Sequence, residues 1–348
     1  MRFSSRFKGR PVAAAALASA LLALAVGCGS SGGGKGTADA GNAGKEADVT
    51  LRVGETGWGS VQALLRTAGL DRTPYTVKWA VFPGGDKQLQ ALQAGALDVA
   101  ESSDIPPAFA AAATAPKWRV VAVARTNTLL QDVVAGKGSR VTSIAGLKGR
   151  KVGYVQATTA QFFLDKLLQQ AGLKWGDIHA VPLTPEEGVA ALDSGSIDAL
   201  ATYGNSVITT TARGAKVIGS GADILSGNFP FEASRKVIAD PARSAALVDL
   251  LARIDKAYAV VRDGREAAYA KAVAAATHQP PAQALQQFRA GEKQIPSQVV
   301  PPAREQIAKE QDVADTFTQL GVLPSRVDVS SYWTDALAGQ LTKALAAS

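Results

Sequence analysis

The sequence predicts an α/β protein made of two similar sheet-and-helix units, followed by a helical last third. Three observations support this fold class. From Asp48 onward, runs suited to strands alternate with helical periodicity, which is typical of layered α/β folds with a largely parallel sheet. A ten-residue segment also recurs at an offset of 100 residues. Beyond Pro241, the pattern is almost wholly that of amphipathic helices.

Glycine, proline and capping residues delimit the elements of the first unit. Thr76–Phe82 contains Thr, Val and Trp, which suit a pleated sheet. Asp86 is expected to cap the helix after it, and Gly95 fits the left-handed position that follows a helix. The expected elements are strand Val49–Gly54, helix Gly59–Ala68, strand Thr76–Phe82, helix Lys87–Ala94 and strand Leu97–Ala100.

The internal repeat is the most informative feature of the folded part. Ala91–Ala100 and Ala191–Leu200 have Ala, Leu, Gly and Asp at the same positions, and each predicts a helix end, a glycine stop and a buried strand. The strand and loop upstream also match, at Val53–Trp58 and Val152–Thr159. Helix–glycine–strand units are common in α/β proteins, but the upstream match favours two similar lobes.

Two α/β lobes have a natural position for a ligand, because small molecules bind at the carboxyl ends of parallel strands. Two such edges that face each other would form a cleft. The loops expected to line it are Glu55–Trp58, Glu101–Pro107, Gln156–Gln161 and Thr202–Ser206. The extended stretches Leu130–Ala135 and Phe231–Ile238 are expected to be the crossovers that act as a hinge. Helices are expected at Pro241–Arg262, Arg265–Thr277, Pro281–Phe288 and Arg304–Leu320.

The N-terminus is typical of a targeting segment. A basic stretch, Met1–Arg10, precedes an apolar run from Val12 to Val26, which is shorter than the ~20 residues of a membrane-spanning helix. It ends at Cys28, the one cysteine of the chain. Residues 1–28 resemble a lipoprotein signal peptide with a lipobox, with Cys28 as the lipidated residue; the alternative is an ordinary signal peptide with an incidental cysteine. Residues 29–47 have the composition of a flexible tether.

The charge of the chain gives little support for nucleic-acid binding. The formal net charge is +7, but Arg2, Arg6, Lys8 and Arg10 all lie in the targeting segment. Without these four, 33 of the 37 basic residues remain against 30 acidic ones. No basic stripe is interleaved with aromatic residues, as a nucleic-acid interface would require.

Several segments together resemble a known family, the substrate-binding proteins of the aliphatic sulfonate, taurine and nitrate ABC importers. The resemblance runs from about Thr50 to Trp333. The segments that carry it are Val77–Gly85, Ala94–Asp98, Asp104–Pro107, Leu147–Gly153, Ser194–Ala199 and Ala314–Pro324. It implies a two-lobed type II periplasmic-binding fold with residues 48–133 in lobe 1, 134–230 in lobe 2 and 231–348 returning to lobe 1.

The resemblance also implies a function and partners. The chain is expected to be an extracytoplasmic, lipid-anchored solute-binding protein on the outer face of the cytoplasmic membrane. It would capture a small organic anion similar to an aliphatic sulfonate and deliver it to an ABC permease with its ATPase, as a monomer. Taurine, nitrate or a thiamine-precursor pyrimidine or other heterocycle are alternative ligands.

In lobe 2, the predicted ligand-binding residues are Gln156, Thr158, Thr159, Gln161 and Tyr203. Thr159 is expected to cap the helix that runs through Phe163, and the free N–H groups and dipole at that helix start favour an anion. The alternative is a plain N-cap that faces solvent. Tyr203 keeps an aromatic residue where the family often has Trp-Asp-Pro, but the acid and the proline are absent.

In lobe 1, the predicted ligand-binding residues are Trp58, Glu101, Ser102 and Ser103. The serine hydroxyls can donate to a ligand oxygen, and Asp104 is expected to cap its own helix. Trp58 either stacks on the ligand or plugs the edge of the lobe. Glu101, with Glu55 in the neighbouring loop, would repel a sulfonate unless the ligand also carries a cation, which leaves an amino-sulfonate or a cationic heterocycle open.

Catalytic and cofactor motifs are absent from the sequence. Nucleophilic catalysis needs an activated Ser, Cys or Lys beside a base, and His179 and His278 lie outside the four candidate loops. No clustered metal ligands, Walker A motif or dinucleotide fingerprint is present. We therefore expect a binding protein without a cofactor or metal, with an enzyme on the same fold as the more distant alternative.

Overall fold

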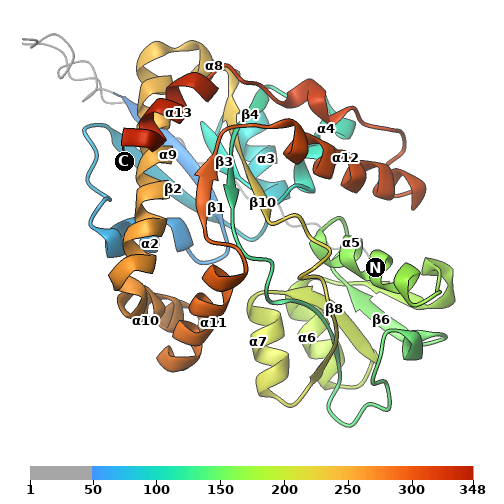
Figure 1. Cartoon of the computed structure of the whole chain (residues 1–348). Coiled ribbons are helices and arrows are strands. Elements are labelled where there is room, and N and C mark those ends of the chain that lie inside the picture. Colours follow the sequence, from blue (N-terminus) through green and yellow to red (C-terminus); the bar gives the residue numbers. More distant parts are fainter. Residues whose placement is uncertain (1–48, 348) are drawn as a thin grey trace, which may run out of the picture. The chain divides into compact units, whose positions relative to one another are not determined.

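The computed structural model describes residues 49–347 (Figure 1). The predicted signal peptide, Cys28 and the tether lie outside these residues. The described chain contains two sheets. Sheet A has six strands in the order β11-β4-β10-β3-β1-β2, and sheet B has five in the order β7-β6-β8-β5-β9.

Sheet A is mixed and is assembled from both ends of the chain. Its strands are β1 (Thr50–Thr56), β2 (Thr76–Phe82), β3 (Val99–Glu101), β4 (Trp118–Arg125), β10 (Asn228–Ser234) and β11 (Gln298–Val300). β1 pairs in parallel with β2 and β3, whereas β10 runs antiparallel to both β3 and β4. β1, β2, β3 and β4 therefore end at one edge, the carboxyl edge of sheet A.

Helices cover both faces of sheet A, and each face has its own apolar core. The helices of this part are α2 (Ser60–Ala68), α3 (Gly85–Gln93), α4 (Pro106–Ala113), α8 (Arg235–Ala239), α9 (Pro241–Val260), α10 (Glu266–Thr277), α11 (Pro281–Gln294), α12 (Arg304–Gln319) and α13 (Ala338–Ala347). α2 and α9 pack on one face and α3, α4 and α12 on the other. β4 contributes Val121 to the first core and Val120 to the second. This two-sided burial explains why β4 is a continuous apolar run and not an alternating one.

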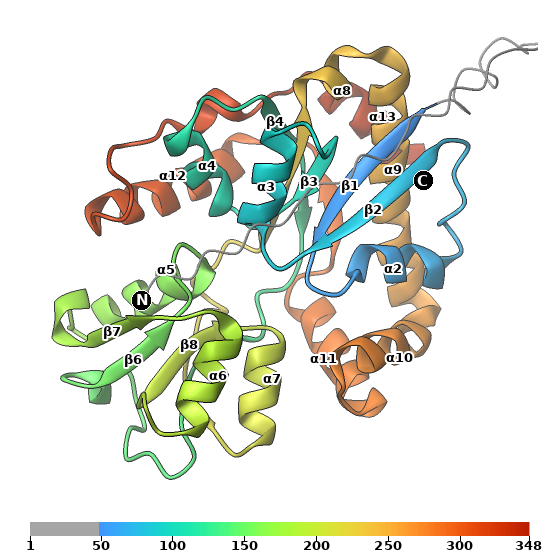
Figure 2. The same cartoon turned by 180° about the vertical axis from the view of Figure 1, so that it is seen from behind.

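Sheet B is built from one continuous part of the chain. Its strands are β5 (Gln131–Ala135), β6 (Lys151–Tyr154), β7 (His179–Pro182), β8 (Ala199–Tyr203) and β9 (Lys216–Ser220). β6 pairs in parallel with β7 and β8, and β5 runs antiparallel to β8 and β9. α5 (Thr159–Gln170), α6 (Pro185–Asp193) and α7 (Asn205–Ala212) contact its strands (Figure 2).

The predicted repeat is present in the backbone. Gly95 and Gly195 both have left-handed φ, 79° and 73°, and in each copy the next amide donates to an alanine carbonyl four residues before the glycine, Ala91 or Ala191. Asp98 accepts from the amide of Arg52 at 2.9 Å, and Asp198 accepts from that of Lys151 at 2.9 Å. In each sheet, the aspartate at the equivalent position of the repeat therefore fixes one strand beside the next.

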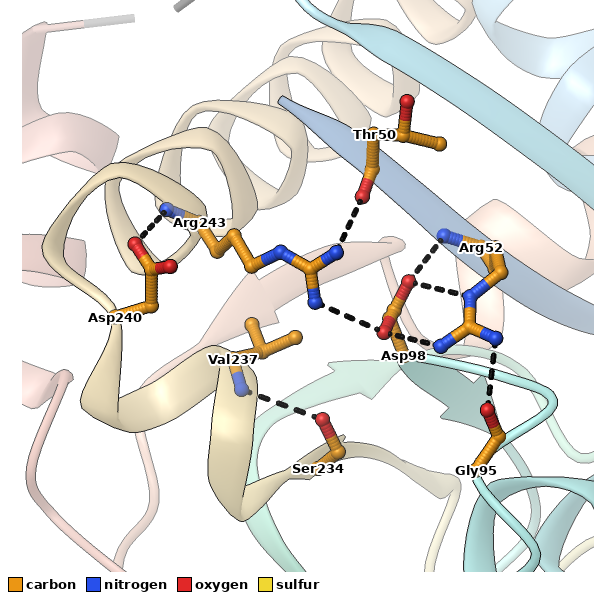
Figure 3. Close-up of polar contacts among 8 residues, drawn as sticks. All are labelled: Thr50, Arg52, Gly95, Asp98, Ser234, Val237, Asp240 and Arg243. Carbon is orange, nitrogen blue, oxygen red and sulfur yellow. Dashed lines mark hydrogen bonds and ion pairs between the residues drawn. The ribbon is translucent and has the colours of Figure 1, made fainter. Parts of the chain in front are cut away.

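The two copies differ in what surrounds the aspartate. Asp98 is buried and also accepts from the Arg52 side chain at 2.8 and 2.9 Å and from Arg243 of α9 at 3.3 Å (Figure 3). Arg243 lies 3.5 Å from the Thr50 carbonyl. The network thus fixes the start of α9 to the starts of β1 and β3. Asp198 is partly exposed, and Arg150 reaches it at 3.8 Å.

The predictions for the cap of α3 and for the two crossovers were wrong. Asp86 is not the cap of α3: the N-cap is Gly84 in extended conformation, and Asp86 lies in the first turn. The stretches predicted as crossovers instead belong to regular elements: Leu130–Ala135 contains β5 of sheet B, and Phe231–Ile238 contains the end of β10 of sheet A and most of α8. The chain passes between the sheets beside them, at residues 126–130 and 221–227. Extended sequence alone does not distinguish a connecting segment from the strand that follows it.

Candidate ligand-binding site

The start of α5 is the polar loop at the carboxyl edge of sheet B. Thr158, not Thr159, is the N-cap: its Oγ1 accepts from the Ala160 amide at 3.2 Å and donates to the Val155 carbonyl at 2.7 Å. Thr159 is the first helical residue. The prediction was wrong by one residue because two adjacent threonines carry the same capping chemistry. The helix start remains a set of N–H groups with the positive end of the dipole.

The side chains of this loop brace it. Thr159 donates to Gln131 of β5 at 2.7 Å, and Gln161 accepts from the Ala157 amide at 2.8 Å. This last bond holds Ala157 at φ 56°, a left-handed conformation that a residue with a Cβ rarely adopts. Gln156 is exposed. The loop therefore has a fixed backbone, and Gln156 is its solvent-facing side chain.

Tyr203 ends β8 and lies within electrostatic range of the other sheet. It is half-buried, and burial, followed by the charges of Asp86 and Glu186, raises the pKa of its hydroxyl to about 12. Asp86 belongs to α3, which packs on sheet A. The carboxyl edges of the two sheets are therefore near each other at this point.

The serines after β3 differ in what they can offer a ligand. Ser102 is buried, and its hydroxyl donates to Glu232 at 2.6 Å and to the Ser103 carbonyl at 3.0 Å. Its one proton is thus engaged inside the protein. Ser103 is half-buried. Asp104 does not cap α4, whose N-cap is Ile105 without a side-chain bond; it accepts from Ser226 at 2.5 Å.

Two carboxylates lie at the carboxyl edge of sheet A in different environments. Glu55 is fully buried and accepts from the Val61 amide at 3.0 Å and from Gln62 at the start of α2. Glu101 has its backbone held by Gln88, at 2.7 and 3.0 Å. Burial and the charge of Glu55 raise the pKa of the Glu101 carboxyl to about 7. Trp58 is half-buried, and its ring lies 6.4 Å from that of Tyr269.

Gln88, Tyr258 and Tyr269 belong to this edge but were not predicted from the sequence. Gln88 is fully buried and joins the ends of β1 and β3, because it also donates to Thr56 at 2.7 Å. Tyr258 and Tyr269 come from α9 and α10, more than 150 residues after the strands that they meet. Helical periodicity places them only on an inward face, so no local signal identifies them.

Two hollows of the described surface lie away from these residues. A cavity of about 610 Å³ is lined by residues around Lys137, Arg140 and Arg213, and one of about 570 Å³ lies around His179 and Ala191. Neither contains a predicted ligand-binding residue. Residues 49–347 contain no group of His, Cys, Asp or Glu able to hold a metal ion. Within that same range, no helix has the length and apolarity to cross a membrane.

Solved structures of solute-binding proteins share the fold of this chain. The two sheets have the fold of two-lobed solute-binding proteins. The periplasmic aliphatic sulphonate binding protein SsuA from Escherichia coli matches with a TM-score of 0.72 and 27% identity, over 81% of this chain and 91% of that chain. The alkanesulfonate-binding protein SsuA from Xanthomonas axonopodis pv. citri, bound to MOPS, matches with 0.72 and 26%, over 82% and 98%.

The sequence comparisons agree with the fold. The chain is 30% identical to an aliphatic sulfonates-binding protein of Escherichia coli strain K12 over 254 residues, 73% of this chain and 77% of the relative. A family described as NMT1/THI5 like matches residues 76–222. The chain belongs to the family of aliphatic sulfonate-binding proteins, and its role is solute binding. The desulfurization enzyme DSZB, at 16% identity and a TM-score of 0.61, shares the fold.

Proposed function

We propose that this protein binds an aliphatic sulfonate or similar small organic anion between the carboxyl edges of its two sheets. The observation that carries the proposal is the braced start of α5, where Thr158 and Gln161 fix the backbone around helix N–H groups that favour an anion. Membership of a family whose relatives bind aliphatic sulfonates supports the ligand class.

In this proposal, both sheets contribute to the site. Sheet B supplies the amides around Thr158 and Thr159, with Gln156, Gln161 and Tyr203 beside them. Sheet A supplies Ser103, next to the buried Ser102, together with Glu101 at the end of β3 and Trp58 in the loop after β1. Sheet A with its helices forms one lobe and sheet B with its helices the other, and residues 126–130 and 221–227 connect them. A ligand that contacts both lobes stabilises the closed state by the contacts that exist only there.

The test of the proposed function is calorimetric titration of the purified protein with methane-, ethane- and butanesulfonate, taurine, nitrate, sulfate and thiamine-related pyrimidines. Saturable binding of sulfonates with a 1:1 ratio is the expected result. Binding of a pyrimidine alone would keep the solute-binding role and overturn the ligand class. The same samples, analysed for ligand turnover, test the proposal that the protein binds without chemistry; product formation would favour an enzyme on the shared fold.

The protein is further proposed to act outside the cytoplasm as a lipid-anchored monomer that delivers its ligand to an ABC permease and its ATPase. The periplasmic location of the relatives and the run Leu24-Ala25-Val26-Gly27-Cys28 support this. In a bacterial host, radiolabelled palmitate should label the wild type, and Cys28→Ser should abolish the label. A Cys28→Ser protein that is still labelled would overturn the anchor without affecting ligand binding.

A further inference from the structure

Glu101 differs from the carboxylates around it because, among residues 49–347, its side chain has no hydrogen-bond or ion-pair partner. Glu55 accepts from an amide and Gln62, Glu232 from Ser102 and Asp104 from Ser226. Glu292, on the same side, accepts from Arg262 at 3.0 Å and from Ser297. Among the described residues, no hydrogen bond or ion pair reaches the Glu101 carboxylate, although it is half-buried at the end of β3.

Two tyrosine hydroxyls near Glu101 also lack a hydrogen-bond partner among the described residues. Tyr258 lies in the last turn of α9 and Tyr269 lies in α10, both half-buried. No hydrogen bond to either hydroxyl is formed within residues 49–347. Burial and then the charge of Glu101 raise the pKa of both hydroxyls, so both lie within electrostatic range of that carboxylate. Three polar groups are thus gathered at one place without satisfying one another, and such groups are costly to desolvate unless a partner arrives.

The described surroundings of this cluster are aromatic. The Trp58 ring lies 6.4 Å from that of Tyr269, which packs edge-on against Phe288 at 5.6 Å. The charges of Glu55 and Glu232 both interact with that of Glu101, and both interactions are repulsive. An unpaired carboxylate among electron-rich ring faces attracts a weakly hydrated organic cation, and aromatic cages are the usual receptors for alkylated ammonium groups.

We propose that Glu101, with the rings of Trp58, Tyr258 and Tyr269, forms a subsite for a cationic nitrogen, so that the ligand is a zwitterionic sulfonate with an alkylated ammonium group. This inference rests on the proposed function, because the sulfonate end is assigned to the start of α5. The negative sulfonate then lies at the positive start of α5 on the carboxyl edge of sheet B, and the ammonium group lies at Glu101 on the carboxyl edge of sheet A. A sulfonate without a cation would leave Glu101 desolvated and unpaired.

The experiment compares two ligands of nearly equal shape that differ in charge. The probes are 3-(trimethylammonio)propane-1-sulfonate and 3-(trimethylsilyl)propane-1-sulfonate, in which silicon replaces the charged nitrogen. Titration of the wild type should show the ammonium compound binding at least about tenfold more tightly, the range expected for one charge-assisted contact. In Glu101→Gln, this preference should fall to about twofold or less.

Control variants distinguish binding of the ammonium group at Glu101 from a general attraction by nearby negative charge. Asp104→Asn removes another carboxylate that follows the same strand but already has a partner, and it should keep the preference. Tyr269→Phe retains the ring and should keep most of it, whereas Tyr269→Leu should lose a substantial part. Equal affinities of the two probes for the wild type would overturn the inference. So would an equal loss of preference in Glu101→Gln and Asp104→Asn.

The failure of the inference is distinguishable from that of the proposed function. If ethanesulfonate and the silicon compound bind at the start of α5 and the ammonium compound binds no better, the proposed function stands and the cationic subsite is rejected. If no sulfonate binds, with or without an ammonium group, the sulfonate assignment itself fails, and with it the zwitterionic ligand. Circular dichroism of each variant confirms that it is folded.

Discussion

At the scale of single residues, the two aspartates of the repeat show how one sequence signal acquires two energetic roles. Asp98 and Asp198 both accept from the amide of the neighbouring strand. Asp98 alone is buried and paired with two guanidinium groups (Figure 3). Burial raises the pKa of its carboxyl, but the hydrogen bonds and charge of Arg52 and the charge of Arg243 outweigh this, and the net pKa lies below its usual value.

Replacement of Asp98 by Asn should therefore destabilise the protein much more than the same change at Asp198. Removal of one partner from a buried pair is strongly destabilising, and because both arginines remain about one-third exposed, we expect a loss of about 2 kcal/mol. Asp198→Asn, the matched control, should lose less than about 1 kcal/mol. Urea unfolding of both variants measures the difference; equal losses would show that Arg52 and Arg243 contribute nothing.

The start of α5 gives a second prediction at this scale. Gln156 is exposed at the amino end of the helix, and Gln170 is exposed at its carboxyl end. Gln156→Glu places a negative charge beside the proposed anion, and we expect sulfonate affinity to fall about tenfold or more, mostly in low salt. Gln170→Glu, the control on the same helix, should bind as the wild type does. Unchanged affinity in Gln156→Glu would remove the helix start from the site.

At the scale of elements, the sequence predicts the order of strands and helices well and their ends less well. The repeat is recognisable because a glycine stop and an aspartate act locally, and the structure confirms both copies. The cap of α5 is displaced by one residue because two adjacent threonines have the same capping chemistry, and that of α3 by two because the helix begins at Gly84 and Gly85, before Asp86. In the site, the loops were predicted, whereas the contacts of Gln88 and Tyr258 depend on long-range packing that no local pattern encodes.

The two crossovers are joined by one helix. Gln294, at the end of α11, accepts from the Thr128 amide at 3.0 Å and donates to the Thr128 hydroxyl at 2.8 Å and the Ala222 carbonyl at 3.3 Å. The Thr126 amide also donates to the Gly227 carbonyl at 2.9 Å. A single side chain of sheet A's helical cover thus holds both passages of the chain between the sheets.

Loss of this side chain should loosen the crossovers selectively. In Gln294→Leu, amide hydrogen exchange in residues 126–130 and 221–227 should rise about tenfold, since each lost hydrogen bond is worth about 1 kcal/mol. Gln286→Leu, at an exposed position of the same helix, is the control and should exchange as the wild type does. A uniform rise over both sheets would indicate global destabilisation and not a local role for Gln294.

At the scale of the whole molecule, buried carboxylates make stability depend on pH in an unusual direction. Burial raises the pKa of Asp104 to about 6, although the hydrogen bond from Ser226 acts in the opposite direction. Burial also raises the pKa of Glu310 to about 8 despite hydrogen bonds from Tyr332 and Trp333, and that of Glu232 lies well above its usual value. Each of these groups binds its proton more tightly in the folded chain than in the unfolded one.

Stability should therefore fall as the pH rises. A group whose pKa is raised by folding contributes stability that is complete below its unfolded pKa, near 4, and is lost as the pH passes its folded pKa. We expect the melting temperature at pH 5.5 to exceed that at pH 8.5 by about 5 °C. Calorimetry over this range measures it, and Glu310→Gln should reduce the slope. A maximum of stability near pH 8 would contradict the pKa shifts.

The strand order of sheet A also has a consequence for how the chain is made. β4 lies between β10 and β11, and both of its neighbours are synthesised more than 100 residues after it. Until they emerge, the apolar run Val120–Ala124 has no strand to pair with, and an unpaired apolar strand is a site of aggregation. Sheet B, encoded between the two, is complete earlier. Biosynthesis thus sets a waiting time, during which we expect a holdase chaperone to bind β4.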